Sequence, residues 1–192
     1  MWARTAVLAV GLACASALAG PPKKKKKTPP PPPPPVTAPT PRVKENLSDA
    51  TLSLLEAAEQ VRAFEASDAG GLRPDPSRAI ASDFLRGEAG ASLDSKQLEA
   101  LRSVLYDEKS YRFGQDVSRC RFVPELSFQF QSGIDTLESL VSFSCNQLLF
   151  VMGKPGGRWI PQGTFDIRPA RARVLELARA TLPKSTAIKA LK

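Results

Sequence analysis

The spacing of apolar residues changes along the chain, from helical intervals before residue 110 to alternation after residue 120. In the first part, Leu47, Leu54 and Val61 recur every seven residues, which is the spacing of one apolar helix face. With Ser48 as its N-cap, this pattern predicts a helix that runs to about Ala66.

Two further helices are predicted before the spacing changes. A short one begins at Ser77 and ends at Gly87, with its apolar residues on one side. Asp94 and Gln97 have the separation of a capping box, so a longer helix is expected to open there and to reach about Tyr106.

Apolar and polar residues then alternate, which predicts antiparallel strands with one buried and one solvated face. The first strand alternates Leu126, Phe128 and Phe130 with Ser127, Gln129 and Gln131. A turn at residues 132–135 leads to a return strand. A third strand is expected at residues 148–152, a hairpin turn at 153–157 and a fourth strand at 158–160.

A last helix is predicted after the strands. Asp166 is its expected N-cap, Pro169 lies in its first turn and Pro183 follows its end. The predicted fold class is therefore α+β: N-terminal helices, a three- to four-stranded antiparallel meander and a C-terminal packing helix. Residues 45–192 are expected to form this single small domain.

The first nineteen residues have the pattern of a secretory signal peptide. Arg4 precedes a short apolar stretch, and Ala17 and Ala19 provide an Ala-x-Ala site that predicts cleavage after Ala19. Two other interpretations stay open: an uncleaved anchor, and a lipoprotein signal in which Cys14 carries a lipid anchor.

Residues 20–44 are expected to be a disordered tether rich in lysine and proline. Seven consecutive prolines at 29–35 favour polyproline II, so residues 21–41 would span on the order of 60 Å. The tether either is a plain solvated linker or binds anionic surfaces through its five adjacent lysines, Lys23, Lys24, Lys25, Lys26 and Lys27.

The positive charge is concentrated in the tether. The chain has 27 basic and 19 acidic residues, and residues 1–44 hold eight of the basic residues and none of the acidic ones. Residues 45–192 therefore carry 19 of each and have no net charge. A nucleic-acid partner is not expected, because such domains carry their positive charge on the folded face that meets phosphate.

The composition also argues against an enzyme. The chain has no histidine, which excludes Ser-His and Cys-His nucleophile pairs and His-ligated metals. Residues 153–158 lack the spacing of a phosphate-binding loop, and the expected strand register does not place Glu125 opposite Glu138. No catalytic residue, cofactor or metal is predicted.

Cleavage or lipidation near the N-terminus leaves Cys120 and Cys145 as the remaining thiols in an oxidising compartment. Pairing Ser132 with Asp135 places Cys120 one diagonal step from Cys145, roughly 7–8 Å away. A bulge at Pro124 would close that gap. A disulfide between Cys120 and Cys145 is predicted, with two buried free thiols as the alternative.

The second half of the chain resembles a family of uncharacterised exported bacterial proteins. The resemblance depends on Cys120 followed by Pro124 and on the return strand that includes Phe143, Cys145 and Asn146. Family members carry a Cys-Phe-x-Cys pattern there, and Ser142 replaces the additional cysteine. The resemblance implies export and this kind of fold, and it implies no particular activity.

These observations together predict an exported cell-envelope protein, periplasmic or extracellular. Its domain would be a non-enzymatic interaction or structural domain on a basic polyproline tether. The expected partner is an anionic cell-envelope polymer or an envelope protein, docked on exposed strand edges. The alternative is a secreted inhibitor-like domain, in which a disulfide-pinned hairpin presents residues 153–158 to a target enzyme.

Overall fold

The computed structural model describes residues 35–71, 75, 78–81, 83–115, 120–154 and 157–192, and these belong to one compact unit. The strands in this part of the chain are β1 (Gln60–Asp68), β2 (Ala79–Ile80), β3 (Phe84–Ser92), β4 (Leu126–Ser132), β5 (Asp135–Ser142), β6 (Gln147–Gly153) and β7 (Ile160–Asp166). They form one antiparallel sheet in the order β2-β3-β1-β4-β5-β6-β7.

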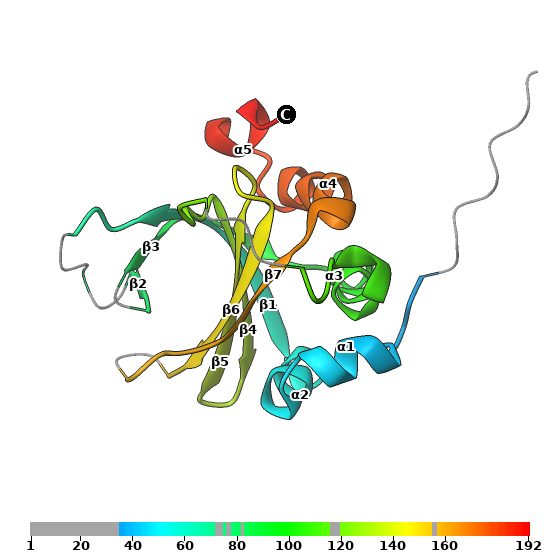
Figure 1. The fold of residues 1–192 in the computed structure, drawn as a ribbon. Helices are drawn as coiled ribbons and strands as arrows, with labels where there is room; N and C mark the ends of the chain where they lie inside the picture. The colour runs from blue at the N-terminus through cyan, green and yellow to red at the C-terminus, as the bar shows by residue number, and fades with distance from the viewer. Residues whose placement is uncertain (1–34, 72–74, 76–77, 82, 116–119, 155–156) are drawn as a thin grey trace, which may run out of the picture. The chain divides into compact units, whose positions relative to one another are not determined.

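The helices precede, interrupt and follow the strands. They are α1 (Pro41–Asn46), α2 (Asp49–Ala57), α3 (Ser95–Tyr106), α4 (Arg171–Thr181) and α5 (Thr186–Ala190), with 3-10 turns η1 (Glu108–Ser110) and η2 (Arg168–Ala170). Figure 1 shows α1 to α4 on one side of the sheet, while the strands curl around the other side into an open half-barrel.

The predicted meander of three or four strands is wrong, because the described residues contain a seven-stranded sheet. The three additional strands come from the segment predicted as helical. Val61 continues the seven-residue spacing of α2, yet it lies on β1, paired with Phe130 of β4. A short apolar run fits helix and strand equally well, and the ladder to β4 decides the outcome here.

The short helix predicted from Ser77 to Gly87 is also wrong, since its described residues include β2 and the start of β3. β3 carries two irregularities in its pairing with β1, and Gly87 and Gly90 lie at them. A side chain at Gly90 would stand 2.4 Å from the backbone oxygen of Thr181, so only glycine fits. Bulges bend and twist a strand, and these two help β3 to curl over the sheet.

Two predictions for the middle of the chain are confirmed, whereas the expected solvated face of the strands is wrong, because Ser127 and Ser139 are buried. α3 begins at Asp94 with both hydrogen bonds of a capping box. β4 and β5 pair in the expected register, with Phe130 opposite Leu137 and Ser132 opposite Asp135. Both features depend on local sequence, which is why they could be predicted without knowing the rest of the fold.

The two ends of the predicted α+β domain differ from the expectation. Residues 36–44, assigned to the tether by their sequence, contact the folded unit: Val36 donates its N–H to Ser103 Oγ at 3.0 Å, and Val43 is fully buried. At the other end, the strand after the hairpin turn continues to Asp166, and α4 starts at Arg171 after the 3-10 turn.

The main core lies between the sheet and the helices. Its largest fully buried side chains include Phe128, Phe130 and Phe150, packed against residues of α1 to α5. A second, smaller cluster of buried apolar residues lies on the opposite face of the sheet: Ala66, Ile80, Leu140 and Val151. The strands therefore have two covered faces, and the second one holds an ion pair.

Candidate functional site

A polar cluster surrounds Glu138 on the face of the sheet that has no helices. Glu138 is fully buried, and its Oε1 accepts hydrogen bonds from Arg86 Nε at 3.1 Å and from Gln129 Nε2 at 2.8 Å. A second nitrogen of Arg86, Nη2, also donates to Oε1 and forms an ion pair. Ser127 Oγ donates to Oε2 at 2.5 Å. Both carboxylate oxygens are thus occupied.

The ion pair joins strands that are not neighbours. Arg86 is on β3 and Glu138 is on β5, with β1 and β4 between them. In a flat sheet these strands would be roughly 14 Å apart, beyond the reach of one arginine side chain. The contact is possible because the sheet curls and brings β3 over β5 (Figure 1).

Two aromatic rings enclose the Arg86 guanidinium. Its central carbon lies 5.6 Å from the ring centroid of Phe64 and 5.9 Å from that of Trp159. Cation–π contacts of this kind strengthen as water is removed. Arg86 therefore links β3 to β1, β5 and the start of β7 through a single side chain.

Serine, glutamate and arginine also occur together in reactive sites, but in this cluster they are shielded from solvent. Ser127 and Glu138 are both fully buried, and the Arg86 side chain is 15% exposed. A substrate does not reach the hydroxyl or the carboxylate in this arrangement. The geometry fits a structural role, in which a paired charge holds the curled sheet together.

Sequence reasoning missed this cluster. Ser127 and Gln129 were expected on a solvated face, and Glu138 was weighed only against Glu125. The structure confirms that those two glutamates do not face each other: Glu125 instead accepts the N–H groups of Phe143 and Ser144 in the turn after β5. The one local signal was a glutamate in the interior of the return strand, between Leu137 and Ser139.

The predicted disulfide is present. Cys120 and Cys145 are bonded, with their Cα atoms 5.7 Å apart. Pro124 lies outside β4, which begins only at Leu126, although Glu125 still donates its N–H to the Val141 carbonyl at 2.9 Å. Residues 120–124, which precede β4, bring Cys120 to the turn that contains Cys145.

An exposed ion pair lies next to the disulfide. Arg121 Nη2 contacts Asp68 Oδ2 at 2.5 Å, and Asp68 also accepts the N–H of Gly70 at 2.9 Å. The Gly70 N–H and the Arg121 guanidinium lower the pKa of Asp68. This pair ties the end of β1 to the chain beside Cys120.

The predicted hairpin at residues 153–158 connects β6 to β7, and of its residues the structure describes 153, 154, 157 and 158. Cys145 lies before β6, whereas this hairpin follows β6, so the disulfide is at the opposite end of the strand. The disulfide and the hairpin of the inhibitor-like alternative therefore lie at opposite ends of β6, and that alternative stays a prediction.

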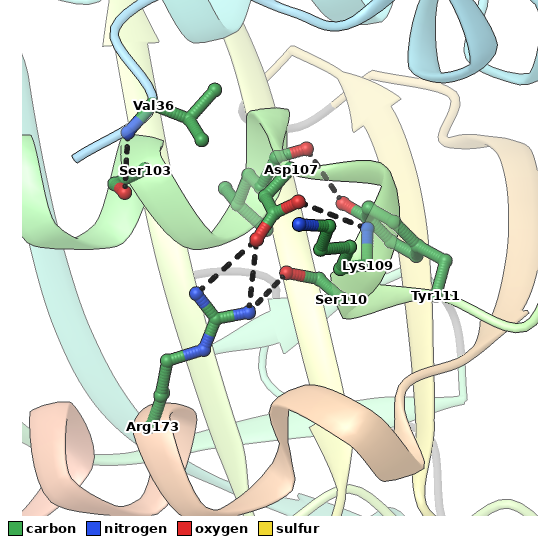
Figure 2. A network of polar contacts seen from close by, with 8 residues as sticks. Val36, Ser103, Asp107, Lys109, Ser110, Tyr111 and Arg173 are labelled. Carbon is green, nitrogen blue, oxygen red and sulfur yellow. Dashed lines mark hydrogen bonds and ion pairs between the residues drawn. The ribbon is translucent and has the colours of Figure 1, made fainter. Parts of the chain in front are cut away.

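Arg173 of α4 forms a polar network with Asp107 and Ser110, at the 3-10 turn η1. Figure 2 shows Arg173 of α4 between Asp107 and Ser110: its Nη2 lies 3.4 Å from Asp107 Oδ2 and 2.8 Å from Ser110 Oγ. Next to it, Tyr111 donates its hydroxyl to the Leu105 carbonyl at 2.8 Å, and burial raises the pKa of Tyr111. This network fastens η1 to α4.

The remaining predicted site residues lie outside the described part of the chain. They are Cys14 and the five lysines Lys23, Lys24, Lys25, Lys26 and Lys27. Within the described residues there is no helix of the length and apolarity that a membrane crossing needs, and no group of three or more His, Cys, Asp or Glu side chains arranged to hold a metal ion.

Comparison with known proteins gives no match: no family model, curated protein or solved structure is similar to this chain. The resemblance to exported bacterial proteins stays a prediction.

Proposed function

We propose that the protein is an exported cell-envelope protein whose folded unit is a non-enzymatic interaction or structural domain. The observation that carries this proposal is the disulfide between Cys120 and Cys145. Disulfides persist in oxidising compartments and are rare where thiols are kept reduced. The signal-like residues 1–19 agree with the same destination.

The charge distribution supports an anionic partner for the tether. In residues 45–192 basic and acidic side chains are equal in number, and some of them pair directly, as in Arg86–Glu138, Arg168–Asp166 and Arg173–Asp107. The lysines at 23–27 are five adjacent positive charges without a neighbouring acid in the sequence. Each lysine near an anionic surface contributes about 1 kcal/mol of binding free energy.

Docking on strand edges receives less support from the structure. β2 has two residues, and β7 carries Pro161 and a pairing irregularity between Phe150 and Val151 of its neighbour. Short edges, prolines and bulges are the features that prevent another strand from pairing. The proposed partner is therefore anionic envelope polymer bound by the tether.

The test replaces the five tether lysines with glutamine and measures sedimentation of the protein with cell envelopes at low and high salt. We expect binding of the unmodified chain to fall as salt rises, and the variant to stay in the supernatant. A matched control replaces five exposed lysines of the folded unit with glutamine: Lys96, Lys109, Lys184, Lys189 and Lys192. Equal sedimentation of tether variant and unmodified chain would overturn the proposal.

A further inference from the structure

One end of the sheet concentrates the exposed apolar side chains of the described residues. Ile134, in the turn between β4 and β5, is 69% exposed, and Ile160, at the start of β7, is 49% exposed. They are the large hydrophobic residues of the described chain that stand out in solvent. Both lie at the end of the sheet that holds the β4–β5 turn and the start of β7, and Figure 1 shows this end of these strands away from α5.

A groove of about 230 Å³ lies at the same end. Its lining residues include the apolar Met152 and Ile160 and the charged Asp135, Lys154 and Arg158. Ile134 precedes Asp135 in the chain. The groove and the two exposed isoleucines therefore form one surface, which we call the hairpin-end surface: Ile134, Asp135, Met152, Lys154, Arg158 and Ile160.

The charge of this surface favours an anionic partner. Lys154 Nζ stands 3.6 Å from Asp135 Oδ1, and both side chains are more than half exposed, so water weakens that pair. Arg158 is exposed and has no ion-pair partner among the described residues. The lining thus includes two cations and one carboxylate.

The neighbouring aromatic residue has the character of an interfacial side chain. Trp159 lies between Arg158 and Ile160 in the sequence, and its ring covers Gly153, where a Cβ would stand 2.7 Å from it. The ring also contacts the Arg86 guanidinium, so one side of the indole is fixed to the fold. Trp159 packs with the small cluster on the face without helices, whereas Met152, the partner of Ile160, packs with the main core, so the two residues lie on opposite faces of one sheet end. Tryptophan, exposed apolar residues and cations gathered at one end of a fold are the set that anchors proteins at a lipid–water interface.

We propose that the hairpin-end surface binds an anionic lipid bilayer, with Ile134 and Ile160 entering the interface and with Lys154 and Arg158 at the lipid headgroups. The proposal rests on the proposed function, since export places the protein beside envelope membranes. It adds a second contact, made by the folded unit and separate from the tether.

The experiment uses the chain that starts at Gly20, which lacks Trp2, so that Trp159 is its sole tryptophan. Vesicles are made of phosphatidylcholine with or without phosphatidylglycerol. With anionic vesicles, we expect a blue shift of Trp159 emission and quenching by brominated lipid. The apolar variant Ile134→Ser/Ile160→Ser should lower vesicle affinity by about tenfold per residue. The cation variant Lys154→Gln/Arg158→Gln should lower it by about fivefold per residue.

Two controls separate the possible failures. Lys184→Gln/Lys189→Gln removes the same charge from exposed positions near α5 and should leave the Trp159 shift unchanged. The tether variant, with residues 23–27 as glutamine, should bind fewer vesicles yet keep the shift at saturating lipid. Sedimentation with vesicles without any change in Trp159 emission would overturn the hairpin-end proposal alone. A tether variant that sediments with envelopes like the unmodified chain would overturn the proposed function instead.

Discussion

The two faces of the sheet are stabilised in different ways. The helix-covered face buries aromatic and aliphatic side chains, with Phe128 and Phe130 almost completely hidden from solvent. The other face, which has no helices and which we call the curled face, has a small apolar cluster and a buried carboxylate. This carboxylate, of Glu138, accepts hydrogen bonds from Arg86, Gln129 and Ser127. The comparison shows that one sheet can use hydrophobic burial on one side and a paired charge on the other.

The largest loss is expected on the helix-covered face. Phe128→Ala removes a ring that is 1% exposed and leaves a cavity in the main core. We expect the free energy of unfolding to fall by about 4 kcal/mol, measured by urea denaturation. Ile134→Ala, at an exposed position, is the control and should change it by less than about 0.5 kcal/mol. Similar losses for both variants would contradict the assignment of the core.

On the curled face, the expected loss depends on whether one or both charges are removed. Glu138→Ala leaves the Arg86 guanidinium without its carboxylate and should cost about 3 kcal/mol. Replacing both partners, Arg86→Met with Glu138→Leu, should cost less than Glu138→Ala, because no charge is left uncompensated. Arg86→Met and Glu138→Leu are also measured alone. If their losses of unfolding free energy simply add up to the loss of the double variant, Arg86 and Glu138 do not interact.

The disulfide fastens the chain that leads into the curled face. Phe122, two residues after Cys120, packs on the Phe84 ring with centroids 5.7 Å apart. Cys120→Ala with Cys145→Ala opens a loop with a sequence separation of 25 residues, which should cost up to about 3 kcal/mol. Adding a reducing agent to the unmodified chain should produce the same shift in the urea midpoint, and should not affect the double variant.

A smaller loss should follow from adding one methyl group where β3 bends. The Cβ of Gly90→Ala would meet the Thr181 backbone oxygen and the Leu182 side chain. We expect a loss of about 2 kcal/mol in thermal or urea unfolding, because backbone and helix end must separate. The neighbouring exposed substitution Ala91→Ser is the control. A Gly90→Ala protein as stable as the control would show that β3 does not approach α4 so closely.

The smallest effect should come from Asp68 at the exposed end of β1. Its pKa is lowered in the folded state, so its contribution is present above the unfolded value of about 4 and is lost as the pH falls through the folded value. In urea denaturation, the stability difference between the unmodified chain and Asp68→Asn should shrink as the pH falls below about 4. A difference that stays constant over this range would contradict the contact with Arg121.

These contrasts explain which parts of the fold could be predicted from the sequence. The capping box at Asp94 and the register of β4 with β5 depend on residues close in the chain, and both predictions are confirmed. The disulfide was predicted from this register and from the two cysteines that remain after N-terminal processing, and it is confirmed. The curled face could not be predicted in this way. Glu138 gains its partner from β3, and the intervening chain gives no sign that these strands meet.

The helical prediction for β1 and β3 failed for a related reason. Val61 fits the apolar spacing of a helix, and the glycines of β3 look like a helix end when they are read locally. Their role as points of close approach to Glu65 and Thr181 becomes visible only with the tertiary structure. The five tether lysines are adjacent in the sequence. Their proposed binding to an anionic surface depends on their charge alone, so it could be predicted without the tertiary structure.

The most direct test of the account is the intact mass of the protein purified from its native host without a reducing agent, together with its reaction with a thiol reagent. The account predicts a chain that starts after Ala19, lacks two hydrogens and does not react with the reagent. A chain that keeps residues 1–19 and has reactive thiols at Cys120 and Cys145 would contradict export to an oxidising compartment.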